Sequence, residues 1–334
     1  MEKILIIKPS SLGDILHALQ VVETLRQSRG QGAGVEITWV VRDIFAPLLE
    51  VCASVDRLLI YERKKGLRGI WELGRQLRRE SFDLVLDMQG LARSAFWALC
   101  TNAPRKIGRG DGREFSRFAF RELASPPPNG FKNSHAVEIL AQFLPALGLP
   151  AELCSSVTFP RAKLSPQIAG ALAGKNSPIL LFPDSRRAEK EWKFFPELTR
   201  LILAKVAQTP VAWVGQSNLR APDDVAANPM FLNFLGKTAL AELPAIVARA
   251  RFCVTNDSGP MHLAAAMNVP VLGIFGPTSP VLYGPFPPSR AGNRTICAPH
   301  GNLAELPPDA VFAECEKFLA PTAGAKQKTH REVQ

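Results

Sequence analysis

Short β-rich runs alternate with helical patterns along the whole chain, and this alternation constrains the fold more than any other sequence feature. A regular β–α alternation predicts parallel sheets with helices on both faces, that is, an α/β fold. The expected strands cover Lys3–Lys8, Val35–Val41, Arg57–Tyr61, Leu84–Met88, Ile179–Phe182, Val211–Val214, Phe252–Thr255 and Val271–Phe275. The expected helices cover Ile15–Arg29, Ile44–Cys52, Leu67–Arg79, His135–Leu147, Pro196–Ala207, Leu240–Ala250, Pro260–Met267 and Asp309–Leu319.

The alternation divides into two similar halves. A stretch rich in Pro, Ser, Ala and Gly around residues 150–176 separates them, and 334 residues exceed what one hydrophobic core usually supports. We therefore predict an N-terminal domain over 1–155, a linker over 156–175, a C-terminal domain over 176–320 and a flexible tail over 321–334. Ligands of such units usually bind where the strands end at their carboxyl termini.

Charge is distributed unevenly along the chain. Lys and Arg number 40 against 30 Asp and Glu, which gives a net charge of +10. The stretch 61–121 holds 14 basic and 7 acidic residues, so it supplies +7 of that total. This surplus predicts a polyanionic partner, which is a nucleic acid, an anionic lipid or a phosphorylated substrate.

Several classes of protein are disfavoured by what the sequence lacks. No apolar run approaches the roughly 18–20 residues that span a bilayer, so the cytosol is the expected compartment. The six cysteines lie far apart and form no CxxC pair, which disfavours a zinc or disulfide framework. The fingerprints GxGxxG, GxxxxGK[ST], GxSxG and HExxH are absent, which disfavours dehydrogenases, P-loop enzymes and the common hydrolases.

The first candidate site is the turn from Lys8 to Asp14, between the first strand and the first helix. A turn of small residues exposes backbone N–H groups at the helix N-terminus, and Asp14 is expected to face the space between the two domains. His17 follows one helical turn later and shares a face with Asp14. The simpler interpretation is that Ser11 or Asp14 only caps the helix.

A second candidate site begins at Thr255, where a strand leads into a helix through Asp257, Ser258 and Gly259. Gly259 permits close approach of a ligand to the backbone, and the helix N-terminus favours a diphosphate. His262 lies in the first helical turn, within reach of such an anion. A well-capped packing helix is the alternative. The neighbouring turn, 273–280, offers hydroxyl donors from Thr278 and Ser279, or is a plain turn.

Two further segments follow strands. In Asp184–Pro196, a serine and a lysine converging at the strand end can neutralise a leaving diphosphate. The alternative is that these charges are solvated loop residues. In the other segment, Asp87 and Gln89 either bind ligand hydroxyls or only close the turn at Gly90.

Together these segments resemble the family 9 glycosyltransferases, the bacterial heptosyltransferases of lipopolysaccharide inner-core assembly. The resemblance covers most of the chain. It rests on the order and spacing of KPSSLGDILHAL (8–19), DMQGLARSA (87–95), HAVEILAQFLPALGL (135–149), the KxFP element (193–196), TNDSGPMHLAAA (255–266) and FGPTSP (275–280).

The resemblance implies a GT-B fold, in which two Rossmann-like domains face each other across a central cleft. The N-terminal domain would bind the acceptor and the C-terminal domain the nucleotide sugar. The implied reaction moves L-glycero-D-manno-heptose from ADP-heptose to a Kdo residue of Kdo-lipid A, with inversion. The ADP-sugar is then a co-substrate, and neither a metal nor another cofactor is required. The implied location is cytoplasmic, at the inner membrane, with an anionic glycolipid as partner and no nucleic acid.

The resemblance also implies roles for individual residues. Asp14 corresponds to the general base, and Lys193 to the cation that stabilises the departing diphosphate. Donor-binding positions are Gly13, Ser185, Arg186, Asp257, Ser258, Gly259 and His262. Acceptor-binding positions are Ser10, Ser11, His17, Arg63, Lys64, Lys65, Gln89 and Arg113.

The sequence leaves three alternative functions open. A family 9 transferase can use another nucleotide sugar or acceptor. A nucleotide-sugar epimerase can share the same two-domain shape. A nucleic-acid-binding protein can use the basic stretch 61–121, but that stretch lacks a known binding motif, and its aromatic residues are expected in the core. Those aromatic residues are Trp71, Phe82, Phe96 and Trp97.

Overall fold

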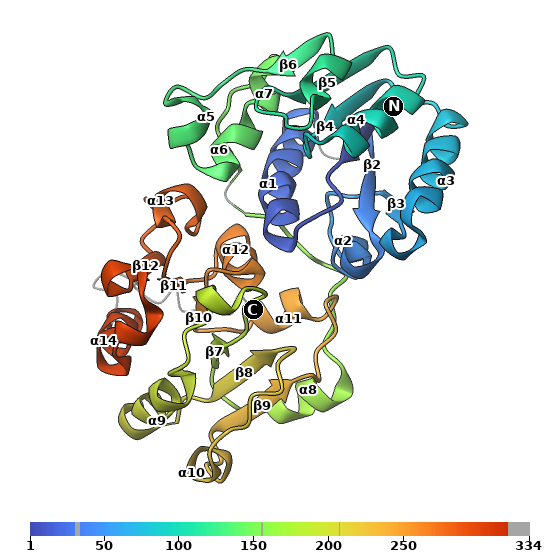
Figure 1. The fold of residues 1–334 in the computed structure, drawn as a ribbon. Coiled ribbons are helices and arrows are strands. Elements are labelled where there is room, and N and C mark those ends of the chain that lie inside the picture. The colour runs from blue at the N-terminus through green and yellow to red at the C-terminus, as the bar shows by residue number, and fades with distance from the viewer. Residues whose placement is uncertain (31–33, 155, 207, 320–334) are drawn as a thin grey trace, which may run out of the picture.

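The computed structural model describes residues 1–30, 34–154, 156–206 and 208–319, and within them it contains two parallel sheets of six strands (Figure 1). The first sheet has the order β3-β2-β1-β4-β5-β6. Its strands are β1 Glu2–Ile7, β2 Val35–Arg42, β3 Arg57–Tyr61, β4 Leu84–Asp87, β5 Arg105–Arg109 and β6 Glu122–Ala124.

The second sheet has the order β12-β11-β10-β7-β8-β9, and all its neighbouring strands are parallel. When the strands of each half are counted from its own start, both sheets have the same order, 3-2-1-4-5-6, which is that of doubly wound nucleotide-binding folds. The strands are β7 Ile179–Phe182, β8 Val211–Gly215, β9 Phe231–Leu235, β10 Phe252–Asn256, β11 Val271–Phe275 and β12 Asn293–Cys297.

Helices cover both faces of the first sheet, which explains why its central strands are almost uniformly apolar. One face packs against α1 Leu12–Ser28, α2 Ala46–Glu50, α6 Ala136–Ala141 and α7 Phe143–Ala146. The other face packs against α3 Gly66–Arg78, α4 Ala92–Cys100 and the 3₁₀ turn η3 Ser116–Ala119. The remaining short elements of this half are η1 Asp43–Phe45, η2 Arg63–Lys65 and α5 Gly130–Asn133.

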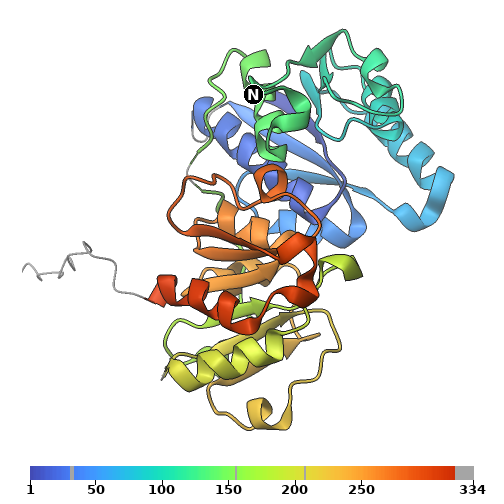
Figure 2. The same ribbon diagram turned by 60° about the vertical axis from the view of Figure 1, so that its left-hand side comes forward.

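The second sheet is covered in the same way. On one face α9 Phe195–Lys205 packs beside α14 Pro308–Leu319, and Figure 2 shows α14 in red on the same side as α9 in yellow. The opposite face carries α8 Pro166–Leu172, α11 Leu243–Val247 and α12 Gly259–Ala266. Smaller elements are α10 Asp223–Ala226, α13 Pro280–Tyr283, η4 Ala188–Lys190, η5 Pro299–Gly301 and η6 Leu303–Glu305.

The two halves meet where α1 packs against α12, and one hydrophobic core continues from one half into the other. Two glycines permit this approach. A Cβ on Gly13 would lie 2.7 Å from the His262 ring, and a Cβ on Gly259 would lie 2.5 Å from the Leu12 side chain. Any larger residue at either glycine would therefore push the two helices apart.

The eight expected strands are all confirmed, with ends that differ by one residue at most. Four short strands, β5, β6, β9 and β12, were not predicted from the sequence. The expected helix over His135–Leu147 is wrong as a single helix, because it divides into α6 and α7. Pro145 has no N–H to donate to the carbonyl of Ala141, so a continuous helix would lack that bond. The expected helix end at Ala207 and the predicted tail over 321–334 lie outside the described residues.

No helix in the described ranges is both long enough and apolar enough to cross a bilayer.

Candidate active site

The turn between β1 and α1 presents a carboxylate that is fixed but accessible. Asp14 Oδ2 accepts hydrogen bonds from the Ser11 backbone N–H at 3.0 Å and the Ser11 hydroxyl at 2.6 Å. Its other oxygen lies 3.5 Å from the Lys8 ammonium. The Asp14 side chain is 43% exposed, whereas Lys8 is almost completely buried. Ser11 occupies the N-cap, so Asp14 belongs to the cap while its side chain stays partly exposed.

The electrostatics of this turn keep Asp14 ionised. Burial alone would raise the pKa of the Asp14 carboxyl, but the Lys8 ammonium and the Ser11 hydrogen bonds outweigh it and hold that pKa well below its ordinary value. Burial lowers the pKa of Lys8, against the opposing effect of Asp14. An ionised carboxylate beside a mostly buried ammonium is therefore the resting state of the turn.

Asp87, at the end of β4, has a structural role in the adjacent turn. Its carboxylate accepts hydrogen bonds from the N–H groups of Gln89 and Gly90 at 3.0 and 3.1 Å, and from the Ser94 hydroxyl at 2.9 Å. Asp87 is buried, and that burial raises its pKa to about 6. Within the described residues, the buried Oε1 of Gln89 has no hydrogen-bond partner. Gln89 is therefore the residue of this turn with unused capacity to bind a ligand.

The corresponding turn of the second half, between β10 and α12, presents a carboxylate with its partners already in place. Asp257 Oδ2 accepts hydrogen bonds from the Lys190 ammonium and the Thr278 hydroxyl, each at 2.6 Å. Asp257 is buried, and its two partners come from two other loops. Ser258 occupies the N-cap of α12, and its buried Oγ is unpartnered among the described residues. The turn thus combines a neutralised carboxylate with a free hydroxyl at a helix N-terminus.

Asn256 fixes the loop that carries Lys190. Its Oδ1 accepts from the backbone N–H of Trp192 at 3.0 Å, and its Nδ2 donates to the carbonyl of Pro183 at 2.8 Å. Trp192 is itself buried and donates its indole N–H to the carbonyl of Leu306 at 2.9 Å. Both ends of the loop are therefore tied to the buried end of β10.

The structure separates the two lysines of this segment. Lys190 is mostly buried against Asp257. Lys193 is 68% exposed and pairs with Glu191, outside this cluster. Ser185 and Arg186, predicted beside the phosphates, lie in the same loop as Lys190, with Arg186 stacked 5.2 Å above the ring of Phe45 from the first half. No role for Lys190 or Asn256 was predicted from the sequence. The signals that point to them are the strand before each residue and, for Lys190, the nearby Trp192, whose burial holds the loop against β10.

Two histidines join the turns directly. His17 Nε2 lies 3.0 Å from His262 Nδ1, and both rings are buried. Burial lowers the pKa of His262 to about 4, and burial together with the neighbouring His262 lowers that of His17. The pair is therefore neutral near pH 7 and shares one N–H. His135 packs edge-on 5.7 Å from the His17 ring and bonds to the Gly284 carbonyl at 3.0 Å.

The predicted acceptor residues form two groups. Ser10, Ser11, His17 and Gln89 lie in or beside the first-half turns. The basic residues Arg63, Lys64 and Lys65 form the exposed turn η2 directly after β3. Lys65 is engaged with Glu62 at 2.7 Å and Glu72 at 3.2 Å. Arg113 is exposed, and its backbone N–H donates to the Gly90 carbonyl at 2.9 Å. All these groups lie at the carboxyl edge of the first sheet.

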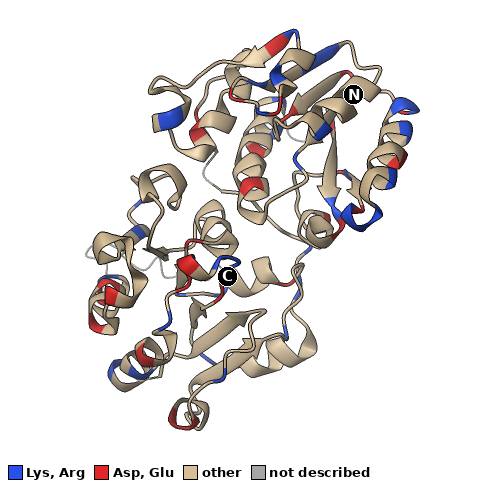
Figure 3. Cartoon of the chain, in the orientation of Figure 1, with Lys and Arg blue, Asp and Glu red and all other residues tan. Residues whose placement is uncertain are grey.

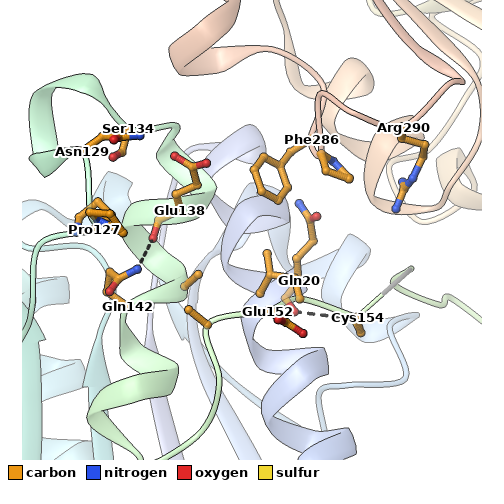
Figure 4. Close-up of a pocket in the computed structure, with 15 residues that line it drawn as sticks. Gln20, Pro127, Asn129, Ser134, Glu138, Gln142, Glu152, Cys154, Phe286 and Arg290 are labelled. Carbon is orange, nitrogen blue, oxygen red and sulfur yellow. Dashed lines mark hydrogen bonds between the residues drawn. The ribbon is translucent and has the colours of Figure 1, made fainter.

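A pocket of about 590 Å³ lies elsewhere between the halves, and none of the predicted site residues lines it (Figure 4). Gln20 and Glu138 from the first half face Phe286 from the second. Within the described ranges, no group of three or more His, Cys, Asp or Glu is placed to hold a metal ion.

Two doubly wound domains with facing helix N-termini define the class of the protein, which is the GT-B glycosyltransferase fold. The chain belongs to glycosyltransferase family 9 (heptosyltransferase), whose family model matches residues 70–304.

Individual relatives agree with this assignment. The chain is 29% identical to lipopolysaccharide heptosyltransferase 1 of Pseudomonas aeruginosa, over 89% of this chain and 85% of the relative. It is 27% identical to lipopolysaccharide heptosyltransferase 1 of Escherichia coli, over 93% of this chain and 98% of the relative. The solved structure of the E. coli heptosyltransferase WaaC with ADP matches with a TM-score of 0.76 and 23% identity, over 95% and 99% of the two chains. The expected GT-B fold is thereby confirmed.

Proposed function

We propose that this glycosyltransferase moves L-glycero-D-manno-heptose from ADP-heptose to a Kdo hydroxyl of Kdo-lipid A, with inversion, in lipopolysaccharide inner-core synthesis. The observation that carries the proposal is the contact between the two turns. A partly exposed carboxylate lies at one helix N-terminus, and a lysine-paired cluster lies at the other, directly across from it. The similarity to lipopolysaccharide heptosyltransferases and the ADP in the similar solved structure support the substrates.

In the proposed reaction Asp14 is the general base. Its partly exposed carboxylate takes the proton of the acceptor hydroxyl while that hydroxyl oxygen bonds to the anomeric carbon of heptose. The bond from that carbon to the diphosphate oxygen breaks with its electron pair on the leaving ADP. Attack from the face opposite the diphosphate inverts the anomeric centre. Because the Asp14 pKa lies below its ordinary value, the carboxylate is ready to accept a proton at neutral pH.

The donor diphosphate is proposed to lie at the N-terminus of α12. Backbone N–H groups of Gly259 and the following residues, the Ser258 hydroxyl and the helix dipole all favour an anion there. The carboxylate of Asp257 alone would repel it, but the Lys190 ammonium and the Thr278 hydroxyl offset that charge. His262 borders the same position from the helix interior.

We assign stabilisation of the leaving diphosphate to Lys190 rather than to Lys193. Lys190 is held at the donor turn by Asp257, whereas Lys193 is exposed beside Glu191. A fixed ammonium stabilises the charge that grows on the leaving group without reorganisation, and metal ions fill that role in other transferases. Ser185 and Arg186, in the same loop, are proposed as further phosphate contacts.

The acceptor is proposed to bind along the carboxyl edge of the first sheet. Arg63, Lys64 and Arg113 offer exposed positive charge to its carboxylates and phosphates, and the unpartnered Gln89 oxygen can accept from a sugar hydroxyl. Lys65, Ser10 and Ser11 border the same edge. His17 after Gly13 and Asp14 favours the first heptosyltransferase of the pathway over the second. The proposed workplace is the cytoplasmic face of the inner membrane.

The decisive experiment is incubation of the protein with ADP-heptose and Kdo-lipid A, with measurement of ADP release and of the mass of the lipid product. A gain of one heptose is expected. ADP release with a different nucleotide sugar only would overturn the donor. A change in the sugar without any acceptor would instead favour an epimerase. Tight oligonucleotide binding that falls steeply with salt would favour the nucleic-acid alternative.

A further inference from the structure

Trp71 does not lie in the core, where the sequence analysis expected it. Of the five tryptophans, Trp39, Trp97, Trp192 and Trp213 are at most 1% exposed, whereas Trp71 is 58% exposed. Leu67, one helical turn earlier on α3, is 76% exposed. The position of Trp71 is thus a correction, and Phe82 and Trp97 are buried as expected. An exposed Trp–Leu pair on one helix face is an unusual use of apolar surface.

The exposed apolar side chains continue beyond α3. The helix α3 packs beside α4, and α4 packs beside η3, so the three elements form one layer over the first sheet. Trp71 contacts the ring of Phe96 on α4, with 5.1 Å between ring centroids. Leu99, at the end of α4, and Phe115 and Phe118, at η3, are also exposed. We call the set Leu67, Trp71, Leu99, Phe115 and Phe118 the outer face.

Positive charge accompanies the outer face. Figure 3 shows Lys and Arg in blue at both ends of α3. The guanidinium of Arg117 lies 5.4 Å from the Phe118 ring centroid. Other exposed basic residues on or next to these elements are Arg68, which pairs with Glu72, and Arg75, Arg78, Arg79 and Arg121. Apolar side chains among arginines form the pattern of surfaces that lie in the headgroup region of anionic bilayers.

We propose that the outer face docks this protein on an anionic phospholipid bilayer. Leu67, Trp71, Phe115 and Phe118 would lie among the headgroups and upper acyl chains, and the neighbouring arginines would lie against the phosphates. The phosphates of a nucleic acid could bind the arginines, but a nucleic acid would not bury the aliphatic side chains of Leu67 and Leu99. The choice of a membrane rests on the lipid acceptor proposed above.

The location of the outer face fits a lipid-borne acceptor. The turn η2, with its basic residues, leads directly into α3. Arg113 immediately precedes the η3 region and is bonded through its backbone to Gly90 beside Asp87. The outer face therefore borders the edge of the sheet at which the acceptor is proposed to bind. A docked enzyme would meet the acceptor sugar without extracting its acyl chains from the bilayer.

Tryptophan fluorescence tests the docking directly, because Trp71 is the one exposed tryptophan of the five and all five lie within the described residues. The protein is mixed with vesicles of phosphatidylcholine and phosphatidylglycerol that contain no acceptor. We expect a blue shift and protection from acrylamide quenching, and no change with phosphatidylcholine alone. Vesicle binding without any change at Trp71, or the same change with an oligonucleotide alone, would overturn the proposal.

A triple variant, Leu67→Ser, Phe115→Ser and Phe118→Ser, tests the apolar contribution. We expect at least about tenfold weaker binding to the anionic vesicles, since insertion scales with buried apolar area. The control is Leu219→Ser with Val281→Ser, two exposed apolar residues of the second half, which should bind as wild type. Equal vesicle binding by the triple variant and the control would overturn the proposal.

Transfer to a water-soluble Kdo acceptor without acyl chains separates this proposal from the function. The triple variant should retain that activity, because its three residues lie outside the proposed catalytic and binding positions. If the protein transferred heptose to the soluble acceptor but did not bind vesicles, only the docking proposal would be contradicted. If it bound vesicles but transferred heptose to no Kdo acceptor, only the proposed function would be contradicted.

Discussion

The β1–α1 turn and the β10–α12 turn occupy equivalent places in two sheets of the same strand order, yet they present their aspartates in opposite ways. Asp14 is 43% exposed and bonds only within its own turn, through one oxygen to Ser11 and through the other to Lys8. Asp257 is buried and connects two other loops through Lys190 and Thr278. One turn thus leaves its carboxylate partly exposed, and the other uses its carboxylate to hold two loops together.

This difference shows that the strand topology determines where a site can lie, but not the role of each residue in it. A helix N-terminus at a switch point favours anions in both halves. What decides the role is how many partners the surrounding loops supply. Asn256 and Trp192 bring a loop, and with it a lysine, onto Asp257, whereas Lys8 belongs to the same segment as Asp14.

Removal of the partly exposed carboxylate should have the largest effect. In Asp14→Asn the turn keeps its hydrogen-bonding shape but loses its base, so turnover should fall about 10²–10⁴-fold. ADP affinity, measured by calorimetry, should stay within about twofold of wild type because Asp14 lies on the acceptor side. Asp224→Asn, an exposed aspartate paired with Arg200, is the matched control and should keep full turnover. Near-normal turnover of Asp14→Asn would contradict its role as base.

The two lysines between β7 and α9, Lys190 and Lys193, allow the second test. Lys190→Gln should lower turnover about 10²–10³-fold, as loss of one fixed charge-stabilising donor does, and should weaken ADP binding. Lys193→Gln should change either value by less than about threefold. Lys190→Arg keeps the charge and should restore part of the activity, which separates a charge effect from a folding defect. A larger loss at Lys193 than at Lys190 would reverse the assignment.

The choice between these lysines marks the limit of what the sequence predicts here. Strands with continuous apolar runs, such as β1 and β7, can be predicted from the sequence, because burial on both faces requires uninterrupted apolar residues. The edge strands β6, β9 and β12 were missed, because one side of an edge strand faces solvent and tolerates polar residues such as Glu122, Asn293 and Arg294.

Site residues could likewise be predicted only where the local sequence determines their position. Positions fixed by local chain direction, such as Asp14 after β1 and Ser258 before α12, could be placed from the sequence alone. Lys190 could not, because its position depends on the Asn256 and Trp192 bonds between segments some 65 residues apart. The exposure of Trp71 likewise depends on which face of α3 the packing against α4 leaves open.

Stability should distinguish the two aspartates in the reverse order from turnover. Asp257→Asn leaves the mostly buried Lys190 without its counter-charge, so the free energy of unfolding should fall by about 1–3 kcal/mol. Asp14→Asn removes a half-exposed carboxylate 3.5 Å from Lys8, and the buried Lys8 keeps the attraction of Asp87, so the cost should be no more than about 1 kcal/mol. Urea unfolding at pH 7 measures both. If Asp14→Asn lowered the free energy of unfolding as much as Asp257→Asn or more, the two aspartates would not differ in their structural role.

The contact between the turns should make the fold sensitive to mild acid. Burial lowers the pKa of His262 to about 4, so between about pH 6.5 and pH 4 the unfolded chain binds a proton that the folded chain does not. The free energy of unfolding should therefore fall as the pH falls through that range. In His262→Gln the fall between pH 7 and pH 5 should be smaller by about 2 kcal/mol.

Asp87 acts in the opposite direction, because its raised pKa, about 6, stabilises the folded state as the pH falls below that value. It is present in wild type and variant alike, so its contribution cancels in the difference between them. His300→Gln, at an exposed histidine far from the pair in sequence, should retain the wild-type pH dependence. If His262→Gln also retained the wild-type pH dependence, the His17–His262 contact would not be the cause of the acid sensitivity. The contact between the two halves would then carry no electrostatic cost at low pH.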